Sequence, residues 1–298
     1  MEPGRTPMSP SVHGKTEQQK RALRVRACIV TIQKAGQELK LPQMVIATAA
    51  TFFHRFFACN PLHEHDRLVM VMACLFLASK VEEVPKKARD VILATHYVAR
   101  KEVLHADSAE FARFREDVIR HERLLVTNIS LAVDHPYHYL VSLAKAVDPV
   151  NKDLIQISWN FVNDSLRTEV CLNYDPRLIA GAALYLSVKC LGFNITRNGA
   201  PATLFEVINM PKALIEEVSS QILDLYETAP SLASMRGDGS GSGASTGSTH
   251  MPAEDGECKA PVPEYHKQNH RLWKRNVAQG DHYRYRRDEQ QKKRKQRV

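Results

Sequence analysis

Two short groups of residues have side chains that could bind a metal or transfer protons. The segment His63–Asp66 carries two imidazoles and two carboxylates. Alternate side chains of an extended loop point to opposite sides, and no thiol pair completes a tetrahedral set, so we interpret this segment as a solvated loop. His121 and Glu122 resemble an acid–base pair, but neighbouring side chains on a helix point about 100° apart. We therefore predict no metal site and no catalytic site.

Motifs of phosphate-transferring enzymes are absent from the sequence as well. No Walker A pattern occurs, and neither does the His-Arg-Asp or the Asp-Phe-Gly triplet of protein kinases. The glycines of residues 237–249 alternate with Ser, Ala and Thr, which is typical of a flexible linker and not of a phosphate-binding loop. We interpret the chain as a non-enzymatic protein without a cofactor.

The positive charge of the chain is concentrated at its carboxyl end. The formal net charge is +8. Residues 264–298 contain twelve Lys or Arg and four Asp or Glu, a balance of +8, so residues 1–263 are neutral overall. A neutral body does not favour nucleic-acid binding by the body itself. In the tail, one basic cluster is typical of a nuclear localisation signal: Lys292, Lys293, Arg294, Lys295 and Arg297.

The same tail alternates aromatic residues with arginine over residues 282–287. Such side chains can stack on single-stranded bases, so RNA or another acidic molecule is a candidate partner of the tail, beside a role in import alone. The six cysteines form no Cys-x-x-Cys pair, which favours reduced thiols in the cytosol or nucleus. No secretory signal is visible at the N-terminus. We predict a nuclear protein.

The elements that position these residues are expected to be helices. The longest apolar run, Leu68–Ser79, is too short for a membrane span and long enough for a helix buried on all sides. Its end, residues 73–80, recurs as residues 182–189 with four of eight positions identical, including the lysines Lys80 and Lys189. A chance match of two core helices is the alternative. We predict two helical domains, each built around one buried helix.

Prolines mark several helix boundaries. Pro42, Pro136 and Pro176 each precede or begin a new helical pattern, another helix is expected to begin near Asn151, and Pro85 is expected in the first turn of a helix. No segment alternates apolar and polar residues as a strand does. We therefore expect an all-α protein with these parts: a disordered N-terminus (1–15), a first domain (16–132), a second domain (133–230), a flexible linker (231–263) and the basic tail (264–298).

Three segments together resemble the cyclin box. The first, residues 75–87, ends a buried helix in Lys-Val-Glu-Glu and continues with Pro and basic residues; the second is residues 120–125 and the third residues 161–168. His-Pro-Tyr at 135–137 is similar to the linker between boxes in cyclins K and T. The resemblance covers about residues 20–230 and is to the transcription-linked cyclins K, T and L. It implies two tandem five-helix cyclin boxes.

The resemblance also implies a function. A chain of this family binds and activates a cyclin-dependent serine/threonine kinase, here in RNA polymerase II transcription elongation. Carried over by position, Lys80, Glu122 and Val126 are expected to face the kinase; an internal ion pair between Lys80 and Glu122 with no partner role is the alternative. A second alternative is a TFIIB-like factor that binds DNA with two cyclin-like repeats, which the neutral body and the missing N-terminal zinc ribbon argue against.

Overall fold

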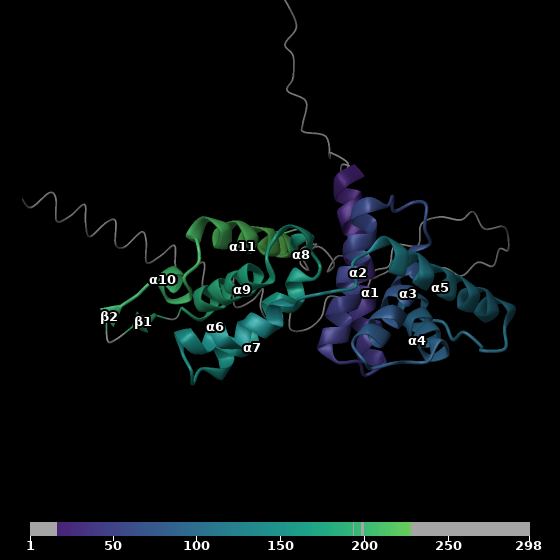
Figure 1. The fold of residues 1–298 in the computed structure, drawn as a ribbon, viewed down its shortest axis with the longest axis horizontal. Coiled ribbons are helices and arrows are strands. Elements are labelled where there is room, and N and C mark those ends of the chain that lie inside the picture. Colours follow the sequence, from purple (N-terminus) through teal and green to yellow (C-terminus); the bar gives the residue numbers. More distant parts are fainter. Residues whose placement is uncertain (1–16, 193, 198–199, 228–298) are drawn as a thin grey trace, which may run out of the picture.

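The computed structural model describes residues 17–192, 194–197 and 200–227, and these residues form two helical groups that lie side by side (Figure 1). The first group contains α1 (Glu17–Glu38), α2 (Gln43–Cys59), α3 (Arg67–Val81), α4 (Ala88–Arg100) and α5 (Ala109–Asn128). The second group contains α6 (Pro136–Val147), α7 (Lys152–Ser165), α8 (Val170–Asn173), α9 (Pro176–Leu191), α10 (Leu204–Ile208) and α11 (Lys212–Glu227). The prediction of two tandem all-helical domains is confirmed.

Each group surrounds one buried helix. In the first group α3 packs against α1, α2, α4 and α5, and every residue from Val69 to Ser79 is buried. In the second group α9 packs against α6, α7, α8 and α11. The two copies of the sequence repeat therefore occupy the same place in the two groups, and the burial predicted for Leu68–Ser79 is confirmed for all but its first residue.

Polar side chains begin several of these helices. Asp66 accepts hydrogen bonds from the amides of Leu68 and Val69 at the start of α3. Asn151 and Asp175 cap α7 and α9 in the same way. Such caps satisfy backbone amides that the helix itself leaves without a partner. The helix starts expected near Asn151 and at Pro136 and Pro176 are confirmed.

The start expected around Pro85 is wrong. Helix α4 begins at Ala88, and Pro85 lies in the connecting loop. The reason is the way α3 ends: the amide of Val84 donates to the carbonyl of Ser79 at 2.8 Å, and the amide of Glu83 donates to that of Lys80 at 3.2 Å. This pair of bonds is a Schellman motif, which requires a left-handed residue, and Glu83 supplies it with φ of +56°. Because Glu83 and Val84 belong to this turn, α4 begins only after Pro85, at Ala88.

Two features depart from a minimal pair of five-helix domains. The second group includes the short helices α8 and α10, and a two-residue antiparallel pairing joins β1 (Thr196–Arg197) to β2 (Ala200–Pro201). A pairing of this length is too short to show alternation in the sequence. The N-terminus 1–15, the whole of the linker 231–263 and the basic tail 264–298 lie outside the described residues. None of the described helices is long and apolar enough to cross a membrane.

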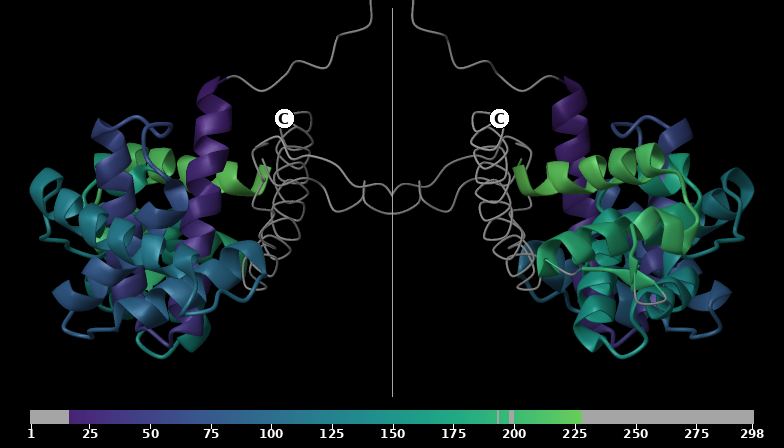
Figure 2. Two further views of the ribbon diagram at one scale, coloured as in Figure 1. Left: turned by 90° about the vertical axis from the view of Figure 1, so that its right-hand side faces the viewer. Right: turned by 90° about the vertical axis from the view of Figure 1, so that its left-hand side faces the viewer.

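Helices α1 and α2 lie at the boundary between the two groups, and α2 contacts α8 directly (Figure 1). The first turns of α1 project beyond the other helices in both end views (Figure 2). Much of this boundary is polar, and its hydrogen bonds join Gln33 to Asn163 and Arg167, Gln43 to Tyr137 and Asn163, Thr48 to His135, and His54 to Leu166. We call this set the seam.

Candidate functional site

Lys80 and Glu122 meet on the surface of the first group. Lys80 lies in the last turn of α3, and its Nζ donates to Glu122 Oε1 of α5 at 2.6 Å. The ammonium also lies 3.9 Å from the centroid of the Phe76 ring, which fixes it from below by a cation–π contact. An ammonium has three N–H donors, so this arrangement leaves donors to spare on the exposed side. The pair is held in place and still able to bind another group.

Apolar side chains lie next to this pair. Val81 follows Lys80 at the end of α3 and is 37% exposed, and Val126, one turn after Glu122 on α5, is 48% exposed. The Lys80 side chain is 44% exposed, whereas that of Glu122 is 15% exposed. We call Lys80, Val81, Glu122 and Val126 the α3–α5 ledge. A charged pair with exposed apolar neighbours can bind protein by hydrogen bonds and apolar contact together.

The other residues considered for chemistry do not form a site. His121 points away from Glu122: it is buried, and its Nδ1 lies 2.7 Å from the carbonyl oxygen of Asp117. In the segment His63–Asp66, His63 and Glu64 are exposed as expected, but Asp66 caps α3 and the ring of His65 packs against Phe56 at a centroid distance of 4.9 Å. The interpretation as a solvated loop is confirmed for His63, Glu64 and Asp66, which are exposed, whereas His65 is half-buried. No group of residues suited to a metal ion occurs in the described part of the chain.

The repeat places a second lysine where Lys80 stands. Lys189 lies in the last turn of α9, and its Nζ is 5.4 Å from the centroid of the Tyr185 ring, as Lys80 lies over Phe76. The left-handed residue follows three positions later in both copies, as Glu83 and as Gly192 with φ of +62°. Among the described residues, however, no carboxylate lies within ion-pair distance of Lys189. The α3–α5 ledge thus differs from its counterpart by the carboxylate that α5 brings to the lysine.

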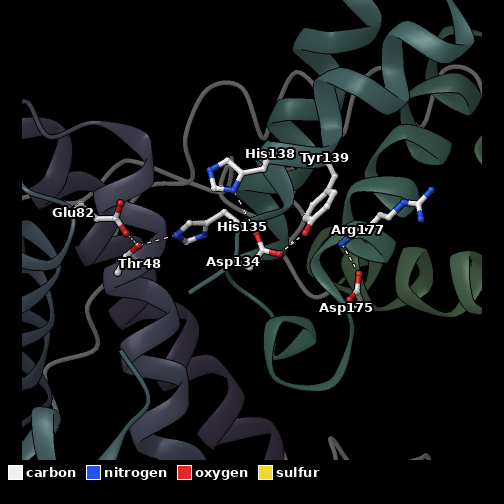
Figure 3. A network of polar contacts seen from close by, with 8 residues as sticks. All are labelled: Thr48, Glu82, Asp134, His135, His138, Tyr139, Asp175 and Arg177. Carbon is white, nitrogen blue, oxygen red and sulfur yellow. Dashed lines mark hydrogen bonds and ion pairs between the residues drawn. The ribbon is translucent and has the colours of Figure 1, made fainter. Parts of the chain in front are cut away.

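Sequence reasoning did not identify a polar chain that begins beside the ledge. Glu82, the residue that caps α3, accepts a hydrogen bond from the Thr48 hydroxyl of α2 at 2.6 Å. Because that hydroxyl donates its only proton to Glu82, its oxygen accepts from Nε2 of His135, 2.8 Å away (Figure 3). Burial lowers the pKa of His135 to about 4, although the nearby carboxylate of Glu82 acts in the opposite direction. The imidazole is therefore neutral, with its proton on Nε2.

The residues around His135 hold the start of the second group. Asp134 accepts from the hydroxyl of Tyr139 and lies 3.4 Å from Nδ1 of His138, so its side chain closes over the first turn of α6 (Figure 3). The hydrogen bond from the Tyr139 hydroxyl lowers the pKa of this carboxyl against the effect of desolvation, and the contact with the His138 imidazole acts in the same direction as Tyr139. The chain from Glu82 through Thr48 to His135 therefore ends on a segment that is itself fixed.

Comparison with known proteins gives the family. The sequence profile of the cyclin N-terminal domain matches residues 4–133, and that of the cyclin C-terminal domain matches residues 135–236. The chain belongs to the cyclin family. The first helical group is thus the N-terminal cyclin box and the second the C-terminal cyclin box, and the resemblance found in the sequence is confirmed.

Individual cyclins of the T, K and L types are similar to this cyclin. Cyclin-T1-3 of Oryza sativa subsp. japonica is 37% identical over 203 residues, which are 66% of this chain and 41% of that protein. Cyclin-K of Danio rerio is 37% identical over 206 residues, 64% of this chain and 47% of that protein. Cyclin-L1 of Gallus gallus is 34% identical over 212 residues, 68% of this chain and 39% of that protein. This cyclin spans less than half the length of each of these relatives.

Solved structures show the same fold. A chain of the yeast RNA Pol II CTD kinase CTDK-1 complex matches with a TM-score of 0.60 at 17% identity, over 72% of this cyclin and 68% of that chain. A chain of the CAK complex of Chaetomium thermophilum matches with a TM-score of 0.53 at 19% identity, over 72% of this cyclin and 67% of that chain. The agreement over both groups of helices supports the tandem architecture.

Proposed function

We propose that this cyclin is the non-catalytic regulatory subunit of a cyclin-dependent serine/threonine kinase that acts on the RNA polymerase II C-terminal repeats during transcription elongation. The similarity to cyclins T, K and L supports this proposal. So does the fold shared with chains of two complexes, one of which is described as an RNA Pol II CTD kinase.

The observation that carries the proposal is the α3–α5 ledge. Lys80 has N–H donors left over from its contact with Glu122, and it lies at the carboxyl end of α3, where a positive charge is favourable. Its ammonium can donate to the carbonyl groups that end a kinase helix, and Glu122 can accept from kinase amides. Charge-assisted bonds of this kind contribute roughly 1.5–3 kcal/mol each in a partly desolvated interface. Val81 and Val126 add apolar contact.

Such binding explains activation by a shift in population. A kinase is active when a glutamate of its mobile small-lobe helix pairs with the ATP-binding lysine. A ledge that binds this helix only in its inward position stabilises the active arrangement by the difference in binding free energy between the two positions. Chemistry therefore remains with the kinase, and the cyclin contributes the binding energy.

The test is to isolate the full chain with its partners from nuclear extract and to measure phosphorylation of a peptide of the polymerase repeats. We expect a serine/threonine kinase to co-purify and its activity to disappear when the cyclin is depleted. A chain that recovers no such kinase and instead binds duplex DNA would favour the TFIIB-like alternative.

The nuclear location is part of this proposal. The basic cluster Lys292, Lys293, Arg294, Lys295 and Arg297 supports import, and residues 282–287 support contact with RNA through the tail. Removing residues 264–298 is expected to abolish nuclear accumulation and leave kinase binding intact. If the tail binds RNA, its affinity falls steeply with salt; affinity that does not change with salt contradicts that role.

A further inference from the structure

The turn that carries Lys80 is tied to the second box by one hydroxyl group. Thr48 is fully buried and joins Glu82, two residues after Lys80, to His135, the residue that precedes α6. A hydroxyl with one proton can donate to one neighbour while it accepts from the other, and here it does both. The position of His135 therefore determines how the Thr48 hydroxyl is oriented toward Glu82, and the position of Glu82 determines how it is oriented toward His135 (Figure 3).

A cleft separates parts of the two boxes close to this chain of hydrogen bonds. Its volume is about 530 Å³, and His135 and Pro136 form part of its wall together with Thr51 and Arg55 of α2. Arg55 extends to the segment that connects the two boxes, where its guanidinium donates to the main-chain oxygens of Ser130 and Ala132. Together with the bond from His135 to Thr48, these directional hydrogen bonds fix how residues 130–135 and the start of α6 sit against α2.

A side-chain hydrogen bond also stabilises the turn that follows α3. Glu83 adopts a left-handed conformation that a residue with a Cβ rarely takes, and such a conformation persists only where neighbouring contacts fix it. The bond from Thr48 to the Glu82 carboxylate is the side-chain contact immediately before this residue. It holds the end of α3 against α2 and with it the direction in which Lys80 leaves the helix.

We propose that Glu82, Thr48 and His135 form a positioning relay that fixes the Lys80 turn for kinase binding and makes its geometry depend on the placement of the C-terminal box. This inference rests on the proposed function for its last step only. None of the three residues touches the kinase in this account; each acts through the orientation of the α3–α5 ledge. It follows that a partner or substitution that shifts α6 alters kinase affinity from a distance.

Thr48→Val tests the relay because valine has the shape of threonine without the hydroxyl, so that both bonds are lost and no cavity forms. Thr48→Ser keeps the hydroxyl and is the conservative rescue. Gln43→Met is the matched control: it lies on the same helix and breaks seam contacts to Tyr137 and Asn163 that do not reach the α3 turn.

The first measurement is amide hydrogen exchange of the full chain without kinase. Loss of a hydrogen bond to a carboxylate corresponds to a change of about tenfold or more in a local opening equilibrium. We expect Thr48→Val to speed exchange at Glu83 and Val84 by about that factor, with Thr48→Ser and Gln43→Met close to wild type. The amides of Leu75 and Leu77 report on the core of the same helix and are expected to stay unchanged. Equal acceleration at all four amides would show general destabilisation and overturn the relay.

The second measurement is the Kd for the co-purified kinase. We expect Thr48→Val to weaken binding about tenfold in the wild-type background and to have no further effect in a Lys80→Ala background, because the relay acts through that lysine. Additive losses in the two backgrounds would overturn the relay. A wild-type chain that binds no kinase would overturn the proposed function, whereas a Thr48→Val chain that binds as tightly as wild type would overturn the relay alone.

Discussion

Glu83 occupies a backbone position that suits glycine, and we expect its replacement by glycine to stabilise the protein. Its φ is +56°, and the corresponding residue of the C-terminal box is Gly192 with φ of +62°. In both boxes this residue donates its amide to the carbonyl of the lysine three positions earlier, at 3.2 Å and 3.3 Å. The second copy of the repeat thus shows that glycine forms the same turn.

The magnitude follows from two opposing effects. The left-handed conformation costs a residue with a Cβ roughly 1–2 kcal/mol, which Glu83→Gly removes. The greater freedom of glycine in the unfolded chain returns roughly 0.5–1 kcal/mol of this gain. The Glu83 side chain is exposed, so its loss uncovers no core. We therefore expect the free energy of unfolding to rise by about 0.5–1 kcal/mol.

The assay is urea unfolding of the full chain, compared by midpoint at constant slope. Glu83→Ala keeps the Cβ and is expected to change stability by less than about 0.5 kcal/mol. Gly192→Ala is the reverse experiment, since an added Cβ meets nothing within 4 Å there, and the expected loss of about 1 kcal/mol is purely conformational. A Glu83→Gly protein that is less stable than wild type, with Gly192→Ala unchanged, would refute the reasoning.

Three further predictions concern other parts of the fold. Burial lowers the pKa of His135 to about 4 from its ordinary value of 6.5, so the unfolded chain binds more protons than the folded chain between these pH values. The free energy of unfolding is therefore expected to fall by up to about 3 kcal/mol as the pH drops from 6.5 to 4. Urea unfolding of His135→Gln is expected to show a smaller fall. Gly36→Ala places a Cβ 2.5 Å from Ile46 Cγ1, and thermal unfolding is expected to show a loss of roughly 1–3 kcal/mol in stability. The double variant Gly36→Ala with Ile46→Ala is expected to lose less stability than the sum of the two single losses. Asp66→Ala is expected to cost about 1 kcal/mol through the lost cap of α3, whereas an equal loss in His63→Ala, or a midpoint raised by zinc, would support a metal site instead.

The sequence predicted the features that depend on strong local patterns. The run Leu68–Ser79 was apolar on every face, so its place at the centre of a domain followed from burial alone. The contact between Lys80 and Glu122 came from the resemblance to cyclins, because residues 42 positions apart show no local sign of meeting. Pro85 was misplaced because a glutamate, and not a glycine, occupies the left-handed position that ends α3.

The polar boundary between the two boxes is partly visible in the sequence of α2. Thr48, Thr51 and Arg55 follow a spacing of three and four residues along α2, so they form one polar stripe on a helix whose other faces are largely apolar. A polar stripe on a buried helix predicts hydrogen-bond partners: those of Thr48 and Arg55 lie in other elements, and that of Thr51 is the Ala47 carbonyl of α2 itself. The identity of those partners, His135 and the linker carbonyls among them, could not be predicted, because it depends on how the two boxes are oriented.

The affinity of the purified chain for its kinase tests the central role of the α3–α5 ledge most directly. Lys80→Ala combined with Glu122→Ala removes two sets of charge-assisted bonds, so we expect the Kd to rise at least about 100-fold while circular dichroism shows an intact fold. Lys189→Ala removes the corresponding lysine of the C-terminal box, also held over an aromatic ring, and is expected to bind as wild type does. A folded double variant that keeps wild-type affinity would contradict the account.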